Sequence, residues 1–183
     1  MIEETNILTH FFPFLISLWF TILEIFMGRL ILSIYCMTMA ICFGLSTAYH
    51  TGCLFNVSYK NKLLTFDQIG IVVLMWGSNL PIIFIGFNNE LKWIYVFITT
   101  LSVVAIIVTR QLDLKFLFAL IAIGWIQAFH INNPKIYDIL IATFSIYLTG
   151  LVFYFETYHT IWHILVVTAA FQHYHNLHIN YNE

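Results

Sequence analysis

Two histidines near the carboxyl-terminal end of the chain have the spacing of a metal-binding pair. His159 and His163 enclose the tripeptide Thr-Ile-Trp. Residues four apart lie on one face of a helix, with Cβ atoms roughly 5–6 Å apart. Two imidazoles so placed can bind one cation, as paired histidines on a helix do in zinc proteases. The pair alone is weak evidence, because the chain has eight histidines.

His50 is the candidate third ligand, and Asp67 and Ser46 are the candidate groups beside the ion. Three protein ligands plus a water form the catalytic zinc arrangement, whereas structural zinc sites are closed and usually contain cysteine. Asp67 would hold or deprotonate that water, whose pKa zinc lowers to about 7. Ser46 precedes His50 by about one helical turn. We therefore predict metal ligands His50, His159 and His163 and catalytic residues Asp67 and Ser46.

The composition places these residues in a membrane. The chain has 183 residues, of which 61% are hydrophobic and 9% charged, whereas soluble domains carry roughly 25% charged residues. So few charges cannot cover a water-soluble surface, and we expect a multi-pass integral membrane protein in a membrane that the sequence does not identify. A net charge of −2 gives no basic excess and argues against a nucleic-acid partner. The three cysteines fall in or beside one apolar stretch, which argues against a disulfide framework.

Seven apolar segments predict an all-α integral membrane fold, a seven-transmembrane helix bundle that forms one domain over residues 1–183. A spanning helix needs about 20 mainly apolar residues. The fifth segment is the shortest. The segments are Asn6–Phe26, Leu30–His50, Phe66–Phe87, Leu91–Thr109, Phe116–His130, Ile136–Phe155 and His159–Leu177.

The order of these segments brings the candidate residues to one membrane face. His50 ends the second segment and Asp67 begins the third. With seven crossings, the seventh segment begins on the same face, where His159 and His163 lie. The basic residues of the connections favour a cytosolic amino terminus by four to three. Lys60, Lys62, Arg110 and Lys115 lie on the expected cytosolic side, and Arg29, Lys92 and Lys135 lie on the other.

Other polar residues have plainer interpretations. His10 and His130 are expected to be interfacial anchors, and Asp67 alone would also suit a helix N-cap. Glu24 and Asp138 have no evident partner, so we expect them to be interfacial or helix-contact residues. A haem site between helices is a minor alternative. His159 and His173, fourteen residues apart, have a suitable spacing, but no other segment has a matching pair.

Four motifs resemble the progestin and adipoQ receptor family, which includes the adiponectin receptors and the bacterial haemolysin III proteins. Residues 6–10 (NILTH) are similar to the opening N-x-x-T-H motif, and residues 46–50 (STAYH) to the S-x-x-x-H motif of the second span. Residues 66–71 and 77–81 resemble the D-x-x-G start and G-S-x-x-P turn of the third. Residues 159–173 follow the pattern H-x-x-x-H…A-A-x-x-H of the seventh span, and the residues within this motif resemble those of the adiponectin-receptor branch.

The resemblance implies a seven-helix bundle with a cytosolic amino terminus and zinc near the cytosolic face. His50, His159 and His163 match the family's zinc ligands, and Asp67 matches the carboxylate that contacts the zinc-bound water. Two departures stand out. The long amino-terminal segment of the eukaryotic receptors is missing, so we expect no partner binding through it. The sixth connection shrinks to residues 156–158, so substrate access there is expected to differ.

The candidate site and the resemblance together imply two functions of different class, because several members of the family look like zinc-dependent amidases acting on ceramide and others are described as receptors or regulators of lipid and zinc homeostasis. The first is a zinc-dependent lipid amidase of the ceramidase type, with membrane lipids, ceramide among them, as its partners. The alternative is a non-enzymatic receptor or sensor for lipid or zinc homeostasis, with a structural zinc and an extracellular ligand. The match to the receptor branch favours the alternative, whereas the short connections offer little surface for a ligand. A pore-forming role has no support, because no segment forms an ordered polar stripe.

Overall fold

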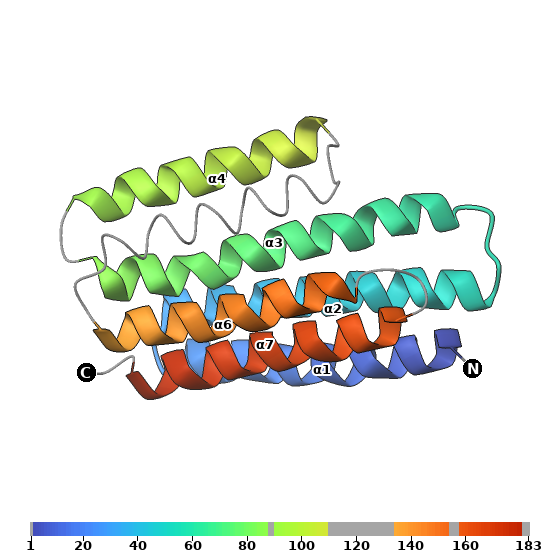
Figure 1. Cartoon of the computed structure of the whole chain (residues 1–183), viewed down its shortest axis with the longest axis horizontal. Helices are drawn as coiled ribbons and strands as arrows, with labels where there is room; N and C mark the ends of the chain where they lie inside the picture. The colour runs from blue at the N-terminus through green and yellow to red at the C-terminus, as the bar shows by residue number, and fades with distance from the viewer. Residues whose placement is uncertain (1, 88–89, 110–133, 154–157, 181–183) are drawn as a thin grey trace.

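Six helices make up the described part of the computed structural model, which comprises residues 2–87, 90–109, 134–153 and 158–180. They run side by side along the long axis of the molecule (Figure 1). The all-α prediction is confirmed for these residues, while the fifth predicted segment, Phe116–His130, lies outside them. The helices are α1 (Ile2–Phe26), α2 (Leu30–Leu54), α3 (Lys60–Gly86), α4 (Leu91–Thr109), α6 (Pro134–Val152) and α7 (His159–Asn180).

The described helices include four that are long and apolar enough to cross a membrane, α1 to α4. This confirms the prediction of a multi-pass integral membrane protein. The helix α7 has 22 residues and is less apolar, because five of its residues are histidines. Two of those histidines, His159 and His163, are candidate metal ligands.

Several helices extend beyond the apolar segments that predict them. The helix α1 begins at Ile2, one turn before the predicted start at Asn6. Likewise, α2 continues to Leu54 and α3 begins at Lys60. Polar residues at a membrane surface can continue a helix whose apolar part lies deeper. The extra turn of α1 matters for the site, because residues three and four apart share one helix face. Glu3, Asn6 and His10 therefore project on the same side of α1.

The helix α2 lies at the centre of the packing and contacts α1, α3 and α7. Its inward residues Tyr35, Met39 and Phe43 are fully buried. The approach of α3 is very close: a Cβ added at Gly70 would lie 3.0 Å from the Cα of Cys42. Small residues permit such contacts between membrane helices, where dispersion replaces the hydrophobic effect as the packing force.

The connection between α1 and α2 is short because the chain reverses at a glycine. Gly28 has a φ of +72°, a conformation that glycine adopts without steric cost. The amide of Arg29 then donates to the carbonyl of Glu24 at 2.9 Å, which completes the end of α1. The connection between α2 and α3 turns at Asn56, with a φ of 47°.

Glu24 is a helix-contact residue, as expected, and the structure gives it three partners that the sequence does not reveal. This fully buried carboxylate lies 2.6 Å from the Tyr174 hydroxyl and 2.7 Å from Nδ1 of His178. Arg29 lies 3.8 Å from its other oxygen. A buried charge needs such compensation, and these contacts connect the end of α1 to α7. Asp138 is exposed on α6.

His173 is a structural residue that satisfies a carbonyl beside a proline in α3. Pro81 lies inside α3 and has no N–H to donate to the preceding turn. Nε2 of His173 donates to the carbonyl of Ser78 at 2.9 Å, and the Thr143 hydroxyl lies 2.9 Å from Nδ1. The carbonyl that Pro81 leaves without its helical donor is that of Gly77, and His173 binds the next carbonyl along α3, that of Ser78. Because both ring nitrogens are in use, His173 offers none to a haem iron.

Candidate metal centre

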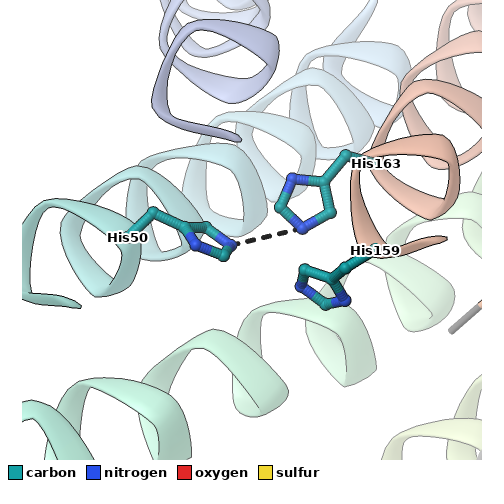
Figure 2. Close-up of side chains that lie close together, drawn as sticks. All are labelled: His50, His159 and His163. Carbon is teal, nitrogen blue, oxygen red and sulfur yellow. Dashed lines mark hydrogen bonds between the residues drawn. The ribbon is translucent and has the colours of Figure 1, made fainter. Parts of the chain in front are cut away.

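Three histidines converge where the end of α2 meets the beginning of α7. His50 comes from α2, and His159 and His163 come from α7 (Figure 2). One ring nitrogen from each lies within 4.8 Å of the others, so the group can hold a metal ion. Nε2 of His50 and Nε2 of His163 are 3.3 Å apart. The predicted convergence of these three residues is confirmed.

In His50 and His163, the hydrogen bonds of Nδ1 indicate that the other ring nitrogen, Nε2, faces the centre as an acceptor. Nδ1 of His50 lies 2.6 Å from a carboxylate oxygen of Glu3 and donates to it. His163 hydrogen-bonds the backbone carbonyl of Asn6. Its Nδ1 lies 3.4 Å from the Thr9 hydroxyl, and because that hydroxyl donates its own hydrogen to the Asn6 carbonyl at 2.8 Å, Nδ1 is the donor toward Thr9. A neutral imidazole has one donor and one acceptor nitrogen. Both Nε2 atoms therefore present lone pairs to each other.

This arrangement fits a bound cation. Two acceptor nitrogens at 3.3 Å repel unless a positive charge, a proton or a metal ion, lies between them. Both rings are almost completely buried, at 2% exposure for His50 and 1% for His163, so water does not separate them freely. His159 adds a third ring with its centroid 4.4 Å from that of His163. Three neutral imidazoles are a donor set that metal ions accept.

Asp67 and Ser46 lie where the sequence predicts, beside the three histidines. Asp67 is buried near the beginning of α3, and Ser46 is buried on α2 one turn before His50. The Ser46 hydroxyl hydrogen-bonds the Asp67 carboxylate. The serine thus fixes the direction of the carboxylate. The roles of both residues in a reaction stay predictions.

A cavity of about 310 Å³ connects these groups. Its lining is mixed: the polar side chains include the three histidines, Asp67 and Ser46, and most of the apolar side chains come from α3 and α7. Such a combination of an apolar pocket with a few convergent polar groups is typical of a small-molecule site. The apolar lining includes Leu64, Ile71, Trp162 and Val166.

His10 is a member of the site, which corrects the expectation that it is an interfacial anchor. The side chain points into the bundle with 4% exposure, and its ring centroid lies 4.1 Å from that of His163. Phe43 stacks on His10 with ring centroids 5.4 Å apart. His10 also lines the cavity. The other expected anchor, His130, lies outside the described residues.

Sequence reasoning missed the contribution of the first turns of α1. Glu3 binds His50, and Asn6 binds His163 through its carbonyl and Thr160 through its side chain at 2.6 Å. The spacing of Glu3, Asn6 and His10 was the available signal, because these positions share a helix face. Starting the helix at Asn6 left Glu3 outside it.

Comparison with known proteins agrees with this architecture. The profile of the family described as haemolysin-III related matches residues 2–174. That range contains all the candidate site residues and most of the described helices. A search of curated proteins gives no match. The chain therefore belongs to the haemolysin-III-related family, a family of membrane proteins.

Proposed function

We propose that this chain is a seven-span, adiponectin-receptor-like membrane protein with a cytosolic amino terminus that hydrolyses a lipid amide of the ceramide class at a zinc site. One observation carries the proposal: a cavity of about 310 Å³ whose wall holds three converging imidazoles and the buried carboxylate of Asp67. The motifs of the second, third and seventh segments resemble the progestin and adipoQ receptor family, several members of which look like zinc-dependent amidases acting on ceramide, and this resemblance supports the same function.

The donor set and its spacing favour zinc as the metal. Nitrogens about 2.0–2.1 Å from one tetrahedral zinc ion lie about 3.3–3.4 Å apart. The separation of the two Nε2 atoms, 3.3 Å, agrees with this value. Three histidine ligands with no cysteine form the set that zinc uses in catalytic sites, where a fourth position stays available.

Zinc at this centre would supply Lewis-acid activation of a water molecule and of an amide carbonyl. The residues of the chain supply the proton transfers. Asp67 accepts the proton of the water as the water oxygen bonds to the amide carbon. Asp67 then donates this proton to the nitrogen as the carbon–nitrogen bond breaks, which releases a carboxylic acid and an amine. The Ser46 hydroxyl keeps the carboxylate directed at the cavity.

The size of the cavity matches the reacting part of a lipid rather than a whole lipid. One water molecule occupies about 30 Å³ of liquid, so the cavity corresponds to about ten waters. That space holds an amide and its adjoining carbons against Leu64, Ile71 and Val166. A ceramide has two long chains, which must extend from the cavity into the bilayer. The apolar composition of the bundle is compatible with such lateral access.

The test is hydrolysis of a defined ceramide by the protein purified in mild detergent. Mass spectrometry would follow the release of the fatty acid and the sphingoid amine. We expect turnover by the wild type and its loss in His163→Ala, because this substitution removes a ligand. His175→Ala is the matched control, since His175 is exposed on the same helix. Equal turnover in His163→Ala and the wild type, or a zinc-loaded wild type that releases neither product, would contradict the proposal.

A further inference from the structure

We propose that Glu3 is a positioning residue that holds His50 in its metal-binding orientation. Its carboxylate oxygen lies 2.6 Å from Nδ1 of His50, although the two residues are 47 positions apart and belong to α1 and α2. The histidine side chain is 2% exposed and the carboxylate 37%. Glu3 also lines the cavity. Neither composition nor motif assigns this residue a role.

The hydrogen bond determines which nitrogen of His50 faces the centre. A carboxylate accepts a proton from Nδ1, and Nε2 therefore keeps its lone pair for a cation. The negative charge also strengthens the bond and raises the basicity of the ring. The bond prevents a ring flip that would replace the acceptor by a donor. Glu3 thus sets both the tautomer and the direction of the ligand.

His50 and His163 are held in different ways, and Glu3 contacts only the first of these two. His163 is held by the neutral backbone carbonyl of Asn6. His50 instead has a charged partner, and charge-assisted hydrogen bonds are roughly twice as strong as neutral ones. The first turn of α1 therefore contributes a carboxylate that contacts a predicted metal ligand. This contribution requires that α1 begin at Ile2, one turn before the apolar segment.

The inference rests on the metal centre and not on hydrolysis, so it can be tested by metal binding alone. Glu3→Ala removes the acceptor, whereas Glu3→Gln keeps an acceptor oxygen without the charge. Competition with a chromophoric chelator would give the zinc Kd of each purified full-length variant. We expect the Kd to rise about 10–100-fold in Glu3→Ala and less in Glu3→Gln. Glu4→Ala is the matched control, because Glu4 is exposed on the same turn.

A spectroscopic measurement separates positioning from simple support of α1. Cobalt bound in place of zinc has visible bands that depend on ligand geometry, and we expect them to shift in Glu3→Ala and to stay unchanged in Glu4→Ala. The melting temperature of metal-free Glu3→Ala should equal that of the metal-free wild type. If Glu3→Ala does not fold, Glu3→Gln, which has the same shape, still reports on the charge.

The outcomes distinguish this inference from the proposed function. The positioning role would be overturned if Glu3→Ala had the wild-type zinc Kd and cobalt spectrum. If Glu3→Ala does not fold, the same result for Glu3→Gln would overturn it. A wild type that binds no zinc would overturn the metal centre and this inference with it. If zinc binds, the variants behave as expected and ceramide is not hydrolysed, only the proposed function fails.

Discussion

Two buried histidines of α7, His163 and His173, have different roles in the structure. His163 and His173 are both almost completely buried. His173 uses both ring nitrogens in hydrogen bonds to Ser78 and Thr143, so it fastens helices together. His163 uses one nitrogen to bind Asn6 and turns the other toward His50. Burial and residue type are alike, and only the hydrogen-bond partners distinguish a packing histidine from a candidate ligand.

Asp67 should be separable from the metal ligands by substitution. Asp67→Asn keeps the shape and the contact with Ser46 but cannot accept a proton. We expect the purified variant to retain its zinc, measured by elemental analysis, while ceramide turnover falls about 10²–10⁴-fold. Asp138→Asn, at an exposed carboxylate of α6, should change neither quantity. Loss of zinc in Asp67→Asn would instead identify Asp67 as a ligand, and unchanged turnover would exclude it from proton transfer.

At the scale of helices, the distance between α2 and α3 positions the site. His50 and Ser46 lie on α2 and Asp67 on α3, so their contacts depend on how closely these two helices approach. Glycines at the contact allow that approach. Near the opposite end of α2, Glu24 of α1 lies 3.8 Å from Arg29, which precedes α2, and 2.7 Å from Nδ1 of His178 on α7. The helices that bear the ligands are thus fixed at both ends.

Gly77→Ala should lower stability through this contact. A Cβ at Gly77 would overlap the Thr38 side chain, with atoms as close as 1.9 Å, so the helices must separate. Overpacking of this kind costs about 1–3 kcal/mol. Thermal unfolding of the detergent-purified protein measures the loss as a lower melting temperature. Adding Thr38→Ala should recover part of it, because the overlapping hydroxyl and methyl groups are removed. A wild-type melting temperature in Gly77→Ala would contradict the packing argument.

At the scale of the whole molecule, the candidate site joins four helix ends. The beginnings of α1, α3 and α7 meet the end of α2 at one end of the bundle (Figure 1). A metal ion held by α2 and α7 would therefore connect elements that are far apart in the sequence. Binding to the folded state alone raises stability by mass action.

Metal removal should therefore destabilise the wild type selectively. We expect a chelator to lower the melting temperature of the wild type and to leave that of His159→Ala/His163→Ala unchanged. The difference corresponds to about 2.7 kcal/mol when free zinc exceeds its Kd a hundredfold. An equal shift in both proteins would mean that the chelator acts elsewhere. Complete unfolding of the chelated wild type, together with no turnover of ceramide, would favour a receptor with a structural zinc.

The sequence by itself determined that this is a membrane protein and identified the three histidines that could hold a metal ion. Composition requires a membrane, because so few charges cannot cover a soluble surface. The pair on α7 follows from helical periodicity, which depends only on local spacing. The meeting of His50 with that pair follows from counting crossings. The three cysteines are free. These properties depend on local spacing or on the order of the helices, so the sequence alone is enough to predict them.

Only the tertiary structure decided which residues surround the ligands. Glu3 contacts His50, the ring of His10 packs against that of His163 at a tilt, and Glu24 contacts His178, across separations of 47 to 154 residues. The ends of the helices also differ from the predicted segments. Apolar composition indicates only the part of a helix that lies in the membrane, whereas the backbone hydrogen bonds of α1 continue for one more turn, to Ile2. Each contact depends on the rotation of a helix about its axis and on which neighbour it meets. Helix rotation and the choice of neighbouring helix are set by side-chain packing between helices, which depends on residues far apart in the sequence.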